Sequence, residues 1–316
     1  MFIPVKADFK LTRFPYLTVL VCVICLGVFL KQISDWQAYE SAMVDFCDAP
    51  RSNLKRMIFR DIAGEENEMP CVDVVYWIAE SDNEKETIAE IAAEVDPITG
   101  LTADDSRLYV TNMLTEELRN YHIKVPENPD EGLAYETDSW NPVTMLTSTF
   151  AHGSWSHIIF NLIFFIAFAA AVEVLIGSFA YIVAFIVIGL AAGIFSSVSG
   201  MLSGAHFTTV GLSGVVTGMI GLFAFLLPHG RIRCYYWFVI FIGSVAVPAW
   251  ALALWYIGGD IYKLFAYDDH GIVNVMAHVS GGIAGYLFGL VFLRGLRWQM
   301  KHQQGEIDRH ALMPGR

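Results

Sequence analysis

The chain has 316 residues, of which 55% are hydrophobic and only 16% are charged, and its formal net charge is −12. The charge is unevenly distributed, because residues 32–145 hold 25 Asp and Glu residues against 8 Lys and Arg residues. An acidic polar block therefore lies between strongly apolar stretches. This pattern excludes a cytosolic enzyme and a disordered tail, and the lack of a basic surface excludes a nucleic-acid-binding protein.

Six apolar stretches approach the roughly 20 residues that a helix needs to cross a bilayer. In chain order they are 14–30, 156–176, 179–198, 210–227, 234–257 and 272–293. The fourth is short and interrupted by glycines, which is typical of a span that lines a cavity. Basic residues precede the first stretch, as in a signal peptide, but no Ala-x-Ala-like cleavage site follows it. We therefore expect a retained membrane anchor.

Basic residues near the span ends predict the orientation of the chain. They are Lys6, Lys10, Arg13, Arg231, Arg233, Arg294, Arg297 and Lys301. With six spans all of them fall on one side, so both termini are expected in the cytoplasm and the acidic block outside, in the inner membrane of a bacterial cell. The predicted parts are the N-terminus with the first span (1–31), the acidic insert (32–145), a five-span core (146–294) and a cytoplasmic tail (295–316).

The acidic block contains helical patterns at 84–95 and 106–121 and enough apolar residues for a small folded domain. Cys47 and Cys71 are its only two cysteines, and an extracytoplasmic location permits a disulfide between them. The net charge of −17 is compatible with a basic soluble partner or divalent cations. We favour the alternative of a solvated folded insert whose charge keeps it away from anionic lipid.

Four polar residues lie inside predicted spans, where such groups are expensive and are candidates for function. They are His157, Asn161, Ser213 and His278. Each lies within roughly 10 Å of the outer surface at about 1.5 Å per helical residue, so three separate spans place polar groups in one layer. His157 and Asn161 are four residues apart and share a helix face. They either aim at one reacting atom or only tie neighbouring helices together.

Ser213 lies in the segment Gly211-Leu212-Ser213-Gly214, at the expected start of a helix. Unpaired backbone N–H groups there suit a developing oxyanion. His278 is followed by Gly281 and Gly285 on about the same helix face, so the two spans can approach closely and bring a base to the serine. Because no carboxylate lies near these residues within their own spans, the pattern favours a Ser–His dyad over a triad.

Taken together, the segments that hold these residues, on the second, fourth and sixth predicted spans, resemble the rhomboid intramembrane serine proteases. The matching segments are His152–Asn161, Gly211–Gly214 and Ala277–Gly281, followed by Gly285. The resemblance covers about residues 140–294 and the first span. It implies an all-α polytopic membrane protein with a six-helix rhomboid-like bundle. The acidic extracytoplasmic domain, which the charge pattern predicts between the first two spans, is not part of the resemblance.

The resemblance also implies a role for each matching residue. Ser213 would be the nucleophile and His278 the general base, while His157 and Asn161 would complete the oxyanion hole. Glu173 corresponds to a glutamate that ties helices together, and His152 to a structural position near the cavity mouth. No metal or cofactor is implied, and the sequence has no His-Glu-x-x-His motif.

The sequence departs from the family pattern at two places. Val143 and Thr144 stand where the family often has Trp-Arg, which concerns loop packing more than chemistry. Thr217 stands where an aromatic residue commonly stacks on the catalytic histidine. Another group could then position the base, and Asn274 is one turn before His278.

The predicted function is cleavage of the transmembrane segments of membrane proteins within the lipid bilayer, through an acyl-enzyme. One alternative is a catalytically silent relative that binds membrane clients, although such relatives typically lack the serine or histidine present here. The other is a transporter, for which inverted repeats and charged residues near the midplane are expected. The sequence shows no such repeat.

Overall fold

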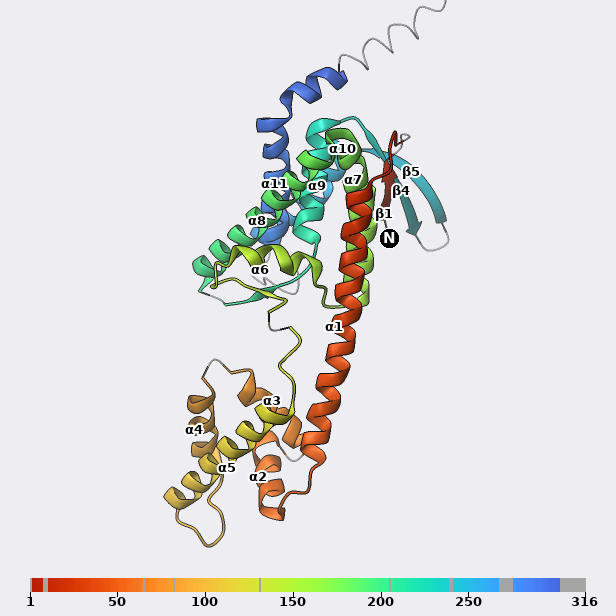
Figure 1. Cartoon of the computed structure of the whole chain (residues 1–316). Helices are drawn as coiled ribbons and strands as arrows, with labels where there is room; N and C mark the ends of the chain where they lie inside the picture. Colours follow the sequence, from red (N-terminus) through yellow and green to blue (C-terminus); the bar gives the residue numbers. More distant parts are fainter. Residues whose placement is uncertain are drawn as a thin grey trace, which may run out of the picture. The chain divides into compact units, whose positions relative to one another are not determined.

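The computed structural model describes residues 2–7, 11–64, 66–81, 83–130, 132–204, 206–238, 241–266 and 275–301. It is mostly helical (Figure 1). The helices are α1 (Tyr16–Asp48), α2 (Asn53–Ala63), α3 (Pro70–Ala79), α4 (Glu84–Glu94), α5 (Ala103–Lys124), α6 (Pro142–Thr147), η1 (Ser148–Phe150), α7 (Trp155–Ile176), α8 (Ser178–Ser203), α9 (Ser213–Leu226), α10 (Ala249–Ala266) and α11 (Val275–Phe292). The strands are β1 (Phe2–Ala7), β2 (Tyr135–Glu136), β3 (Thr208–Thr209), β4 (Arg231–Phe238) and β5 (Phe241–Pro248).

The chain divides into two compact units, and α1 contributes residues to both. One unit consists of residues 32–131, and the other of residues 1–31 and 132–316. We call them the acidic unit and the membrane unit. The segment 132–145, assigned to the insert from the sequence, groups with the membrane unit, because β2 pairs with β3 just before α9.

The acidic unit has its own hydrophobic core, formed where α2, α3, α4 and α5 pack with the end of α1. Helices α4 and α5 agree with the two predicted helical patterns within three residues at each end. The Cys47–Cys71 disulfide joins the end of α1 to the start of α3. A buried ion pair between Arg51 and Glu117, 2.9 Å long, adds a polar tie within the unit.

Four helices in the described part of the chain are long and apolar enough to span a membrane, namely α1, α7, α8 and α11. They correspond to the first, second, third and sixth predicted spans. The boundaries of α7 have local causes. The Ser154 hydroxyl accepts a hydrogen bond from the His157 N–H at its start, and Gly177 ends it with a φ of 83°.

Helix α9 is the fourth predicted span and lies among α7, α8, α10 and α11 (Figure 1). Every residue from Gly214 to Leu226 is buried. Its 14 residues cover only about 21 Å at 1.5 Å per residue, less than the thickness of a bilayer core. Ser213, Val216 and Ile220 of this short helix line a pocket, as expected for a span of this kind.

The predicted fifth span, 234–257, is wrong. Its first half forms the antiparallel hairpin β4–β5, and α10 begins only at Ala249. Strand β1 pairs with the other edge of β4, giving the strand order β1-β4-β5. Tyr, Trp, Phe, Ile and Val dominate the hairpin, and these residues favour strands as well as membranes. The fold is therefore not purely α-helical.

Candidate active site

Ser213 is the first residue of α9, directly after a sharp turn at Gly211. Gly211 has a φ of 116°, a conformation that side chains other than glycine rarely adopt, and its N–H donates to the Ser148 carbonyl, 2.9 Å away. Leu212 is fully buried and anchors the turn. The serine hydroxyl is thus presented beside the first N–H groups of a helix, which have no partner within the helix.

His157 and Asn161 lie on one face of α7, next to this turn. A Cβ atom added to Gly211 would lie 2.7 Å from Nε2 of His157 and 3.9 Å from Nδ2 of Asn161. Asn161 is buried, and its side-chain amide donates to the His157 carbonyl, 3.0 Å away. Both side chains therefore place nitrogen atoms close to the backbone that leads into Ser213.

His278 lies on α11, which packs closely against α9. A Cβ atom on Gly214 would lie 3.3 Å from the Ala277 carbonyl oxygen, and one on Gly218 would lie 3.0 Å from that of Gly281. Gly285 faces the backbone of Gly218 in the same way. The glycine stripe after His278 therefore meets the glycines of α9, which brings the two helix backbones close together.

One pocket of about 1420 Å³ in the membrane unit is lined by Ser213, His278, His157 and Asn161. Other lining residues come from α8 and α10, so five helices contribute to it. Most of the exposed lining surface is apolar, which suits a substrate segment that is itself apolar, and polar side chains from all five helices also line the pocket.

A carboxylate lies next to His278, and the sequence did not predict it. Asp260 on α10 places Oδ2 2.9 Å from Nδ1 of His278, and its Oδ1 accepts a hydrogen bond from the Lys263 ammonium group at 2.7 Å. The preference for a dyad considered only the spans that hold Ser213 and His278, whereas Asp260 lies on another helix. The misplaced fifth span ended at Ile257 and left Asp260 in the following loop.

Thr217 does not stack on a histidine ring, but its hydroxyl donates to the Gly214 carbonyl, 2.9 Å away within α9. Asn274, the sequence-based candidate for positioning His278, lies outside the described residues.

Glu173 and His152 occupy buried positions. The Glu173 carboxylate accepts hydrogen bonds from the N–H groups of Leu17 and Thr18, at 3.0 and 2.7 Å, and from the Thr18 hydroxyl at 2.8 Å. It thereby ties α7 to the first turn of α1. The His152 ring lies edge-on to that of His157, with 5.2 Å between the ring centroids.

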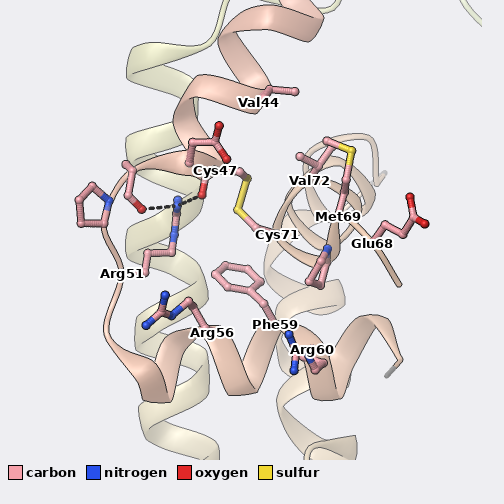
Figure 2. Close-up of a pocket in the computed structure, with 14 residues that line it drawn as sticks. Val44, Cys47, Arg51, Arg56, Phe59, Arg60, Glu68, Met69, Cys71 and Val72 are labelled. Atoms are coloured by element: carbon pink, nitrogen blue, oxygen red, sulfur yellow. Dashed lines mark hydrogen bonds between the residues drawn. A yellow bond between two sulfur atoms is a disulfide. The ribbon is translucent and has the colours of Figure 1, made fainter. Parts of the chain in front are cut away.

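A second pocket, of about 360 Å³, lies in the acidic unit beside the Cys47–Cys71 disulfide (Figure 2). Arg56 and Arg60 contribute basic groups to it, while Arg51 donates a hydrogen bond to the Cys47 carbonyl, 2.7 Å away. Its lining includes no serine or histidine. Within the described residues, no three His, Cys, Asp or Glu side chains cluster closely enough to hold a metal ion.

Two similarities to known proteins bear on the membrane unit. Residues 139–295 match the family model of the Rhomboid domain. Over 167 residues, or 51% of this chain, the sequence is 22% identical to Rhomboid protein 1, mitochondrial, of Saccharomyces cerevisiae. That match spans 45% of the length of the yeast protein. The range matched by the family model includes the start of α7, the start of α9 and the residues around His278.

Proposed function

The chain belongs to the rhomboid family, and from this premise we propose that it is an intramembrane serine endopeptidase. Its substrates are membrane proteins whose transmembrane segments it cleaves. The observation that carries the proposal is the pocket in which Ser213, at the start of a buried helix, shares one lining with His278, His157 and Asn161.

In the proposed reaction the Ser213 hydroxyl attacks the carbonyl carbon of the scissile peptide bond, and His278 accepts the hydroxyl proton. The negative charge that develops on the carbonyl oxygen is stabilised by the Ser213 N–H and by nitrogen donors of His157 and Asn161. His278 then protonates the leaving amine. Water attacks the resulting ester with His278 again as the base, which restores the serine.

The strand pairing supports a membrane topology for this reaction. Strand β1 precedes α1, and β4 follows α9, so their pairing requires the chain to return to its starting side after α1, α7, α8 and α9. Four crossings satisfy this condition. Helices α10 and α11 then complete six spans, and the basic residues on β1 and β4 favour the cytoplasmic side for this sheet and for both termini. We place the protein in a bacterial inner membrane on this basis.

The test is labelling of the detergent-purified protein with a fluorophosphonate, alongside cleavage of a transmembrane substrate. Ser213→Ala and His278→Ala should each abolish both signals in protein that remains folded. Thr115→Ala, at an exposed position of α5, is a matched control that should change neither signal. A folded wild-type protein that neither labels nor cleaves would favour the silent, client-binding alternative.

A further inference from the structure

Asp260 is the acidic side chain that contacts the proposed base. It lies on α10, whereas His278 lies on α11, so the 2.9 Å contact between Oδ2 and Nδ1 joins two helices that are separate in sequence. Both side chains are mostly buried, with 10% of Asp260 and 15% of His278 exposed. Both also line the pocket that contains Ser213.

The contact defines which imidazole nitrogen carries the proton. An ionised carboxylate can only accept hydrogen bonds, so His278 must donate from Nδ1. The Lys263 ammonium group occupies the other carboxylate oxygen at 2.7 Å and favours the charged form of Asp260. Nδ1–H then points to Asp260, and a neutral imidazole keeps Nε2 without a proton.

We propose that Asp260 is a positioning residue that makes the catalytic group a Ser213–His278–Asp260 triad. This inference rests on the proposed function. Asp260 holds the proton of His278 at Nδ1, so that Nε2 is free to take the proton of the Ser213 hydroxyl. When it does so, the imidazolium bears a positive charge beside the negative carboxylate, and Asp260 itself does not become protonated.

This role compensates for the absence of an aromatic residue at position 217. A threonine there hydrogen-bonds within α9 and leaves the ring of His278 without a stacking partner from that position. A hydrogen bond to Asp260 fixes both the orientation and the tautomer of the ring, whereas stacking fixes only its orientation. Among the described residues, the other charged or titratable groups that line the pocket with this pair are Lys263 and Tyr256 on α10 and His157 on α7.

The experiment compares wild-type protein with Asp260→Asn, Asp260→Glu and Tyr262→Phe. Asp260→Asn should lower kcat about 10²- to 10⁴-fold with KM unchanged, because an amide of the same shape favours the wrong tautomer. Asp260→Glu should recover part of that loss, since it restores a carboxylate. Tyr262→Phe is the control, because Tyr262 is an exposed residue of α10 outside the pocket lining, and its kcat should stay within a few-fold of wild type.

A second readout does not depend on turnover. Nitrogen NMR of protein labelled with ¹⁵N-histidine, assigned with His278→Asn, reports which ring nitrogen of His278 is protonated. We expect Nδ1 in the wild type and a shift towards Nε2 in Asp260→Asn. A merely structural tie between α10 and α11 would lower the thermal unfolding temperature of Asp260→Asn without a change of tautomer or a selective loss of kcat.

The outcomes separate this inference from the proposed function. An active wild type with an equally active Asp260→Asn variant would overturn the positioning role and leave the protease intact. A wild type that neither labels nor cleaves would refute the proposed function, and the NMR readout would then still decide the role of Asp260. In that case a proton on Nε2 in the wild type would overturn it as well.

Discussion

Replacing Gly211 by alanine should disable the proposed oxyanion hole while leaving the nucleophile and base in place. The new Cβ would lie 2.7 Å from Nε2 of His157, whereas an ordinary contact begins near 3.4 Å, so the ring has to move by about 0.7 Å. A shift of that size at a donor costs roughly as much as removing it, about 10²- to 10³-fold in kcat. The φ of 116° adds strain of about 1–3 kcal/mol to the fold.

The assay is the rate of cleavage of a transmembrane substrate, with the thermal unfolding temperature measured on the same samples. Gly153→Ala is the matched control, because Gly153 lines the same pocket and a Cβ there meets no atom within 4 Å. That control should retain wild-type activity. If Gly211→Ala is folded and cleaves as fast as the wild type, His157 does not act where the geometry places it, and the proposed oxyanion hole is refuted.

Three further changes probe the scaffold. Burial alone raises the pKa of Glu117, but hydrogen bonds from its two basic partners outweigh burial and hold that pKa below its usual 4.5; its stabilising contribution is therefore present above pH 4.5 and lost at lower pH. Glu117→Gln should cost the acidic unit about 3 kcal/mol and lower the hydrogen-exchange protection of α5 about 10²-fold near neutral pH. Glu173→Ala should lower the unfolding temperature in detergent by removing about 2–3 kcal/mol, with activity per folded molecule retained; a loss of kcat at unchanged stability would contradict its structural role. Gly285→Leu should prevent α11 from packing on the Gly218 backbone and abolish folded protein, whereas Gly295→Leu, where a Cβ meets nothing within 4 Å, should not.

The helices that could be predicted well are those with strong local signals. Helix α7 begins within one residue of its predicted start and ends at Ile176 as predicted, because a serine cap and a glycine mark its limits. Helix α2 was missed, although its signal was present: Ser52 accepts a hydrogen bond from the Lys55 N–H, and apolar residues recur on one helix face. A short helix between two turns gives too brief a pattern to stand out in a charged segment.

The candidate site was predictable where one helix carried two polar residues, and less so where different elements contribute. His157 and Asn161 are four residues apart, so their shared face followed from the sequence. The contact between Asp260 and His278 depends on where α10 begins, and hydropathy does not distinguish a buried strand from a membrane helix of similar composition. One of the two pairing partners of β4 is β1, more than 200 residues away in the chain, and no local pattern predicts this pairing.

The β4–β5 hairpin and the Asp260–His278 contact are two consequences of the same displacement of α10 along the chain. If the helix had begun at Cys234, Asp260 would lie about 39 Å from its start at 1.5 Å per residue, beyond a 30 Å bilayer core. Since α10 begins at Ala249, Asp260 lies about 17 Å from the start, inside that thickness. A carboxylate at such a depth is costly unless it is paired, and both of its oxygens are paired here, with Lys263 and with His278. Removing either partner should therefore destabilise the ionised form of Asp260. Only the loss of its hydrogen bond to His278 should impair the transfer of the Ser213 hydroxyl proton.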